Sequence, residues 1–190
     1  MSQRPKLFAL TRPVKSNLQL TMSDTLPEIR TFLEQTGFPF EVWDCDPELA
    51  DTARFCEHYG VPLENSVNAI LVRSKTGETK YALCVLRAAD RLNGNHTVRK
   101  KLGARKVSFA SAEETREITG MEIGGVTPLV LPQGLPIWID TLVMDCEYVV
   151  LGGGNRSSKI KVSPQVLVLQ AEAEVVSDLA LKNVTPESLL

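Results

Sequence analysis

The spacing of apolar residues along this chain predicts amphipathic helices that alternate with strands. Between residues 25 and 37 the apolar side chains recur every three or four positions, which places them on one face of a helix. We expect Thr25 and Glu28 to form a capping box at its start, and Gly37 to end it. The same spacing predicts a second helix from Asp51 to Tyr59, with Tyr59 on its inner face.

Further helices are indicated by the residues that begin and end them. Asn95–Leu102 has the pattern of a short helix. Ser111 and Glu114 form another capping-box pattern, and Gly120 is placed to end the helix that they begin. Ser163-Pro164 predicts the start of a short helix near the end of the chain, because proline suits a first helical turn.

Strands are predicted where apolar residues alternate or run together. Ser66–Arg73 and Lys80–Leu86 flank the turn Lys75–Glu78, which indicates a hairpin. Other expected strands are Phe38–Cys45, Arg105–Phe109, Leu135–Asp140, Glu147–Leu151, Lys159–Val162 and Glu174–Val176, with a loose tail after Leu181. We find no internal repeat or low-complexity segment.

Asn68 is the unusual residue of the first hairpin strand. Both faces of that strand are otherwise apolar, so we expect the strand to lie in the interior of a sheet. Burying an amide without hydrogen-bond partners costs roughly 1–3 kcal/mol. Asn68 must therefore meet a protein group, a water or a ligand, and the sequence leaves these alternatives open.

The stretch Gly120–Pro128, read Gly-Met-Glu-Ile-Gly-Gly-Val-Thr-Pro, joins a helix to an apolar strand. The pair Gly124-Gly125 lets the backbone approach a ligand or adopt a positive φ, and Pro128 keeps Thr127 extended. Such a loop can direct several amide N–H groups at a carboxylate, a phosphate or a developing oxyanion. An ordinary structural turn fits the same residues.

Composition places the chain among globular proteins of one domain. It has 190 residues, of which 43% are hydrophobic and 23% charged, enough for a core without a metal or disulfide. We expect an arm over residues 1–22, a domain over 23–181 and a tail over 182–190. The four scattered cysteines indicate free, mostly buried thiols in a reducing cytoplasm. We expect no membrane span, no secretion signal and no cofactor.

Basic residues are concentrated although the net charge is −2. The stretches between Asp90 and Glu113 and between Glu147 and Glu172 contain no other acid. We expect them to flank one pocket mouth as a basic face for nucleic-acid phosphates, although a solvated helix face fits them too. The residues proposed for this face are Arg91, Arg99, Lys100, Lys101, Arg156 and Lys159. The basic arm over residues 1–22 has the same two interpretations.

Side-chain chemistry is scarce. We find no Ser-His-Asp arrangement, nucleophile elbow, phosphate loop or metal cluster, and the two histidines are His58 and His96. The remaining features can bind a small acyl group attached to a nucleic acid. If the protein is a catalyst, the amides of Gly124, Gly125 and Val126 must stabilise the oxyanion, because no side-chain base is convincing.

Ten short motifs, each weak alone, occur in an order that is specific. They are Ala53–Pro62, Val67–Val72, Asp90–Asn93, Lys101–Val107, Ala110–Glu114, Ile118–Gly120, Gly124–Pro128, Leu135-Pro136, Asp140 and Gly152–Arg156. In these motifs the chain resembles the YbaK and prolyl-tRNA synthetase-associated editing domains, the insertion-domain-like aminoacyl-tRNA deacylases. The resemblance covers roughly residues 28 to 176.

The resemblance implies a single α+β domain with a curved, mixed β-sheet flanked by helices. It implies hydrolysis of the ester between a wrong amino acid and the 3′ end of a tRNA, with the Gly-x-x-x-Pro motif at Gly124–Pro128 facing the scissile carbonyl. Many members use the terminal ribose hydroxyl of the substrate and a water instead of a side-chain base. We assign the second glycine loop, with Gly153, Gly154 and Asn155, to substrate or tRNA binding.

Asn68 departs from the family pattern, because many members carry lysine there, and asparagine offers only a neutral donor and acceptor. We predict that Asn68 lines the pocket beside Gly124–Pro128. We expect a stand-alone trans-editing deacylase for a small mischarged residue, with mischarged tRNA as partner, no DNA, and synthetase contact left open. The alternatives are a non-catalytic tRNA or aminoacyl-adenosine binding module and a partner-binding protein with a vestigial pocket.

Overall fold

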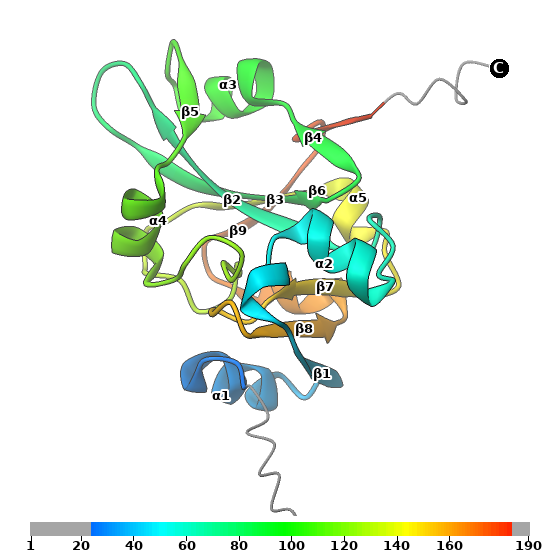
Figure 1. Ribbon diagram of the computed structural model, residues 1–190. Coiled ribbons are helices and arrows are strands. Elements are labelled where there is room, and N and C mark those ends of the chain that lie inside the picture. The colour runs from blue at the N-terminus through cyan, green and yellow to red at the C-terminus, as the bar shows by residue number, and fades with distance from the viewer. Residues whose placement is uncertain (1–23, 184–190) are drawn as a thin grey trace, which may run out of the picture.

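The computed structural model describes residues 24–183 and contains two main β-sheets (Figure 1). The larger has the strand order β5-β2-β3-β6-β9. Its strands are β5 Val107–Phe109, β2 Val67–Ser74, β3 Tyr81–Arg87, β6 Ile137–Asp140 and β9 Ala173–Val176. The first three are antiparallel and the last three parallel, so the sheet is mixed. The expected arm over residues 1–22 and the tail from residue 184 lie outside the described residues.

The smaller sheet is antiparallel, in the order β1-β8-β7, and a two-stranded ribbon adds to the fold. These strands are β1 Phe40–Asp44, β8 Ser158–Val162, β7 Val149–Gly152, β4 Asp90–Leu92 and β10 Ala180–Lys182. An isolated parallel bridge from Ser66 to Val150 connects the start of β2 to β7. The two sheets therefore meet at the end of β2 that carries Asn68.

Helices cover the sheets on several sides (Figure 1). The α-helices are α1 Pro27–Thr36, α2 Thr52–Tyr59, α3 Arg99–Lys101, α4 Ala112–Thr119 and α5 Thr141–Met144. Short 3₁₀ turns are η1 Pro47–Leu49 and η3 Pro164–Leu169, and η2 Gly94–Val98 is a π-helical turn. The predicted α+β class with a mixed sheet flanked by helices is confirmed.

The main apolar core lies between the two sheets and is closed by α1. Leu71 of β2, Ile139 of β6, Leu151 of β7 and Ile160 of β8 meet there, each at most 3% exposed. A second cluster, which includes Trp138, covers the other face of the larger sheet beneath η2 and α3. Burying both faces of the larger sheet explains why β2 is apolar on both sides, and β2 lies between β5 and β3, in the interior position that the sequence predicted.

Two local predictions at helix ends had different outcomes. The capping box of Ser111 and Glu114 at the start of α4 is confirmed in both directions. The capping box of Thr25 and Glu28 is wrong, because Leu26 is the N-cap of α1. The Thr25 hydroxyl instead donates to the Gly153 carbonyl at 2.5 Å, which ties α1 to the second glycine loop.

Other corrections concern exposure and the end of the chain. Tyr59 was expected on the inner face of α2, but it is 40% exposed. The chain also does not loosen directly after Leu181, because Ala180–Lys182 pairs with Asp90–Leu92 as β10. Asp140 anchors this strand by accepting a hydrogen bond from the Ala180 amide at 2.8 Å.

Candidate functional site

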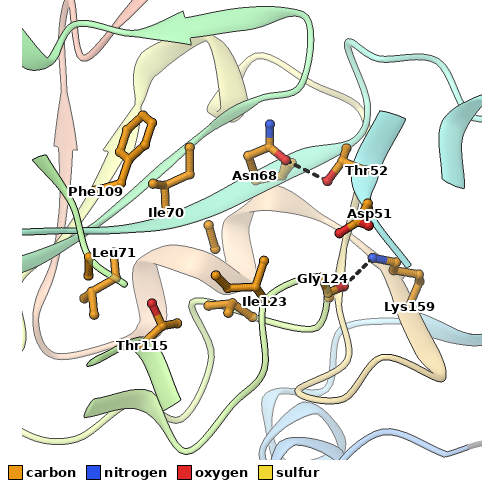
Figure 2. A pocket seen from close by; sticks show the side chains of 15 residues that line it. Asp51, Thr52, Asn68, Ile70, Leu71, Phe109, Thr115, Ile123, Gly124 and Lys159 are labelled. Carbon is orange, nitrogen blue, oxygen red and sulfur yellow. Dashed lines mark hydrogen bonds between the residues drawn. The ribbon is translucent and has the colours of Figure 1, made fainter. Parts of the chain in front are cut away.

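A cavity of about 380 Å³ opens where the sheet, α2, α4 and the Gly120–Pro128 loop meet (Figure 2). We call it the glycine-loop cavity. Its wall is formed by Asp51, Thr52, Val67, Asn68, Ala69, Ile70, Leu71, Phe109, Ala110, Thr115, Ile123, Gly124, Val126, Gly152 and Lys159. The wall is largely apolar. Four of its polar residues gather at the end where α2, β8 and the loop approach one another, namely Asp51, Thr52, Asn68 and Lys159, whereas Thr115 lies toward the other end (Figure 2).

The peptide groups of the loop are fixed through their carbonyls. The Ile123 carbonyl accepts a hydrogen bond from Arg156 at 2.6 Å, and the Gly125 carbonyl accepts one from the Gly154 amide at 2.8 Å. In a trans peptide the N–H points opposite to the C=O. The amides of Gly124 and Val126 therefore point away from the second glycine loop, and neither has an acceptor among residues 24–183.

The third predicted amide has a different partner. The Gly125 N–H donates to the Glu122 carbonyl at 2.9 Å, which closes the turn. It is therefore already engaged, and the candidate donors for a ligand are the amides of Gly124 and Val126. This corrects the expectation that Gly125 would supply a free donor.

Steric constraints explain the two glycines of the loop. Gly124 has φ +92°, a backbone conformation that glycine adopts without strain, and a Cβ there would meet the Arg156 guanidinium. A Cβ on Gly125 would collide with the backbone of Asn155, and one on Gly152 with the Gly125 carbonyl. The two glycine loops pack backbone against backbone, so each holds the other in place.

Lys159 brings a nearly buried ammonium to the cavity wall. The residue is 5% exposed, and its Nζ donates to the Ala50 carbonyl at 2.7 Å and to the Gly124 carbonyl at 2.8 Å (Figure 2). It also lies 5.1 Å from the centre of the Phe55 ring. Burial lowers the pKa of this ammonium below its ordinary value. No carboxylate within residues 24–183 forms an ion pair with it.

Asn68 lies on the same wall and is half-buried. Its Oδ1 accepts a hydrogen bond from the Thr52 hydroxyl at 2.7 Å, which joins β2 to the start of α2 (Figure 2). Asp51 precedes Thr52 and contributes a half-exposed carboxylate to the wall. Asn68 thus meets a protein group, the Thr52 hydroxyl, and also faces the cavity.

Thr127 and Pro128 lie behind the wall. Thr127 is fully buried, and its hydroxyl has no hydrogen-bond partner among the described residues. Its amide donates to the Met121 sulfur at 3.4 Å. These two residues shape the loop from inside the protein and do not line the cavity.

The second glycine loop supports the first. Asn155 accepts bonds from Ser157 and Ser158 through Oδ1, while its Nδ2 donates to the Asp24 carbonyl at 2.8 Å. Arg156 donates to the Pro47 carbonyl as well as to Ile123. The Gly153 carbonyl accepts from the Thr25 hydroxyl and from the amide of Leu26, the N-cap of α1. These partners give the loop a positioning role, and its part in substrate or tRNA binding stays a prediction.

The remaining basic residues do not reach the glycine-loop cavity. Arg91 lines a second cavity beside β4, and Arg99 donates to the Asn95 carbonyl at 2.9 Å. Lys101 pairs with Glu174 at 2.7 Å, and Lys100 is exposed on α3. The two acid-free stretches therefore lie on different elements, and only Lys159 of the six residues lines the glycine-loop cavity.

Sequence reasoning missed several wall residues. Asp51, Thr115 and Phe109 line the cavity but had no motif of their own. The sequence indicated Thr115 indirectly, because it lies one helical turn after the predicted capping residue Ser111. In the structure the Thr115 hydroxyl donates to the Ser111 carbonyl at 2.8 Å. Phe109 showed none beyond its strand.

Histidine and metal chemistry have no geometric support in the described part of the chain. His58 and His96 are exposed and do not line the cavity. Across residues 24–183 no three His, Cys, Asp or Glu side chains form a metal-binding group. In the same range no helix has the length and apolar character needed to cross a bilayer.

Comparison with known families gives a match over residues 46–169 to the aminoacyl-tRNA editing domain. The uncharacterized protein YwhH of Bacillus subtilis (strain 168) is 27% identical over 143 residues, which are 75% of this chain and 88% of that protein. A proline–tRNA ligase of Pelobacter propionicus is 24% identical over 110 residues, or 58% of this chain and 19% of the ligase.

Two solved structures have the same fold. The hypothetical protein APE2540 superposes with a TM-score of 0.70 and 25% identity, covering 81% of this chain and 99% of that one. A proposed trans-editing enzyme for prolyl-tRNA synthetase gives 0.65 and 23%, covering 80% and 96%.

Proposed function

This chain belongs to the aminoacyl-tRNA editing domain family, and from that membership we propose that it hydrolyses the ester joining a wrong amino acid to the 3′ end of a tRNA. A role in tRNA editing is supported by the family match and by its relatives. The observation that carries the hydrolytic proposal is the pair of amides, Gly124 and Val126, that lack an acceptor on the wall of a cavity.

The two amides are suited to a developing oxyanion. In ester hydrolysis, water adds to the carbonyl carbon and the carbonyl oxygen becomes negatively charged. Donors that are already fixed stabilise that charge without reorganising, and losing one typically costs roughly 2.7–4 kcal/mol of barrier. The bonds from Arg156 and Gly154 provide this fixation, because they hold the carbonyl side of each peptide.

Lys159 contributes charge and position to the same end of the cavity. Its bond to the Gly124 carbonyl orients the next peptide of the loop, and its positive charge favours an oxyanion nearby. The α-ammonium of the substrate would be repelled by Lys159, and Asp51 is the wall carboxylate suited to hold it. The aliphatic wall formed by Ile70 and Leu71 favours a small, uncharged side chain.

Within residues 24–183 the wall has no histidine for proton transfer, and its one carboxylate, Asp51, is assigned to the α-ammonium of the substrate. We therefore propose that the free hydroxyl of the terminal ribose orients the attacking water. The water oxygen bonds to the carbonyl carbon, the bond from that carbon to the esterified ribose oxygen breaks, and a proton from the water ends on that ribose oxygen. The products are the free amino acid and an intact tRNA.

The test is single-turnover deacylation across a panel of mischarged tRNAs with the wild-type protein and Gly124→Ala. We expect wild-type turnover of at least one small mischarged residue, and a loss of about a hundredfold or more in Gly124→Ala, because the loop amides would be displaced. The thermal melt of the variant shows that the fold is retained.

Gly134→Ala is the matched control. Gly134 also has a positive φ, +81°, but a Cβ there would meet nothing within 4 Å. It should therefore show the same kind of backbone strain without displacing the loop. Near-normal turnover in a folded Gly124→Ala protein would reject the amide mechanism, and no deacylation of any tRNA by the wild type would reject the hydrolytic function.

A further inference from the structure

Phe109 is a large apolar side chain that the fold leaves uncovered. It ends β5, the edge strand of the larger sheet, and it is 65% exposed. Exposing an aromatic ring forgoes the burial that usually stabilises it, so a ring exposed beside a cavity suggests a binding surface. Figure 2 shows Phe109 at the end of the glycine-loop cavity opposite Gly124 and Lys159.

Phe109 also borders a second cavity, of about 460 Å³. That volume falls within the range of small-ligand pockets, roughly 300–1,000 Å³. Its wall includes Arg91, Asn93 and Asn95 from the segment around β4 and η2. The two cavities therefore share Phe109 as a wall residue at the edge of the sheet.

The second cavity has the chemistry of a nucleotide site. Arg91 is exposed and makes no ion pair among the described residues, so its guanidinium is available to a phosphate. The Asn93 side-chain nitrogen is held by Thr97 and by the Asp178 carbonyl, which leaves its oxygen as a fixed acceptor for a base edge. An exposed aromatic ring beside these groups is a platform on which a base can stack.

We propose that the second cavity binds the nucleotide preceding the terminal adenosine of a single-stranded RNA 3′ end, with its base stacked on Phe109. The proposal rests on the proposed function for the direction of the strand, because the ester must lie at Gly124. Along β2 the rise of about 3.3 Å per residue separates Asn68 from Val72, the partner of Phe109, by about 13 Å. The terminal aminoacyl-adenosine occupies that length, and the next nucleotide continues past the ring.

The test is direct binding of a short RNA that ends in ACCA-3′ and carries no amino acid, compared with binding of adenosine. Such binding does not depend on catalysis. Fluorescence anisotropy would give affinities for the wild type and for Phe109→Ala, Phe109→Tyr and Arg91→Ala. We expect Phe109→Ala to weaken RNA binding about tenfold, since one base stack is lost, while Phe109→Tyr keeps the affinity. Arg91→Ala should weaken the RNA and lower the salt dependence of its binding. Adenosine binding should change in neither variant.

Leu169→Ala is the control for removing an exposed apolar side chain. Leu169 is 50% exposed and lines neither cavity, so its loss should leave RNA affinity unchanged. Equal weakening of RNA and adenosine in Phe109→Ala would overturn the proposal, because the ring would then hold the terminal base. Unchanged RNA affinity would also overturn it, because the ring would then make no contact with the RNA. A wild type that binds this RNA but deacylates nothing would reject the proposed function and leave the nucleotide site standing.

Discussion

Lys159 shows how much of the candidate site depends on a single side chain. Its ammonium crosses from β8 to the loop and holds Gly124 to Ala50 through two carbonyls. The chain carries asparagine at position 68, where many members of the family carry lysine. The cavity still contains one lysine, Lys159, which β8 supplies instead of β2. The sequence predicted Lys159 only as part of a basic face, because its contact with Gly124 depends on how the strands and the loop pack together.

Replacing Lys159 with methionine should separate activity from stability. The side chain keeps its length, while the loop loses its anchor and the proposed oxyanion loses a nearby charge. We expect single-turnover deacylation to fall at least tenfold. The free energy of unfolding should change by only about 1 kcal/mol, because relief from burying a charge offsets two lost carbonyl partners. Denaturant melts beside the kinetic assay measure both, and a loss of stability that matched the loss of activity would contradict the positioning role.

The same residue predicts a pH dependence of stability. Burial lowers the pKa of Lys159 in the folded protein below its unfolded value of 10.5. Between those two pKa values the unfolded chain binds more protons, so the unfolding free energy gains a contribution that rises with pH. Urea melts at several alkaline pH values should show that rise in the wild type. In Lys159→Met the contribution should be absent, and identical pH profiles would contradict the prediction.

Asn68→Ala tests the residue that the sequence singled out. Its bond to Thr52 is worth roughly 0.5–1.5 kcal/mol of stability, but its position on the wall should make turnover fall tenfold or more. Asn65→Ala is the matched control. Asn65 donates to the Tyr148 carbonyl at 2.9 Å and does not line the cavity. The control should lose stability and keep turnover, and the same pattern in Asn68→Ala would assign Asn68 a purely structural role.

At the scale of elements, the sequence predicted structure that depends on neighbouring residues, but it did not predict contacts between distant segments. The hairpin of β2 and β3, and the helix from Ser111 to Gly120, follow from neighbouring residues and were predicted. The capping box at Thr25 failed because a partner 128 residues away, Gly153, takes the hydroxyl. The loop glycines could be recognised from adjacent residues alone. The roles of Arg156 and Lys159 could not, because they depend on contacts that only the fold creates.

The start of α4 couples helix capping to the cavity. The Ser111 hydroxyl accepts from the Glu114 amide at 3.1 Å, and Glu114 accepts from the Ser111 amide at 2.8 Å. Ser111→Ala should cost about 1 kcal/mol of unfolding free energy, and Ser111→Thr, which keeps the hydroxyl, should cost little. Since Thr115 lines the cavity one turn later, the alanine variant should also lose part of its turnover. Equal melts for the two variants would show that the cap does not stabilise α4.

Glu114 gives this helix start a dependence on acid. The hydrogen bond from the Ser111 backbone is the largest cause that lowers the pKa of Glu114, with Tyr81 and Arg73 also contributing. A carboxyl whose pKa is lowered by folding stabilises the protein above its ordinary pKa, and that contribution is lost as pH falls through the folded pKa. Glu114→Gln should therefore melt like the wild type in strong acid and less stably at neutral pH.

At the scale of the whole molecule, the net charge is −2, but α3 carries three consecutive basic residues, Arg99–Lys101. We expect the double change Lys100→Glu and Lys101→Glu to weaken tRNA binding and its salt dependence, because phosphate contacts release counterions. Hydrolysis of a small aminoacyl-adenosine ester should remain unchanged. Lys100 should carry most of the effect, since Lys101 is already paired with Glu174. Unchanged tRNA affinity would mean that these lysines form only a solvated surface.

The long-range strand pairings impose an order on how the protein is made. β1 pairs with β8, so Phe40 can form its strand pairing only after Val162 has been synthesised. In the same way β4 can pair fully with β10 only after Lys182 has been synthesised. Such non-local pairings make folding slow compared with that of a helical bundle, because long loops must close first. On the ribosome the hairpin of β2 and β3 can form early, but the two glycine loops cannot meet until residue 156 emerges. The candidate catalytic amides therefore gain their geometry only after residue 156 has emerged, and a nascent chain stopped before that residue should have no hydrolytic activity.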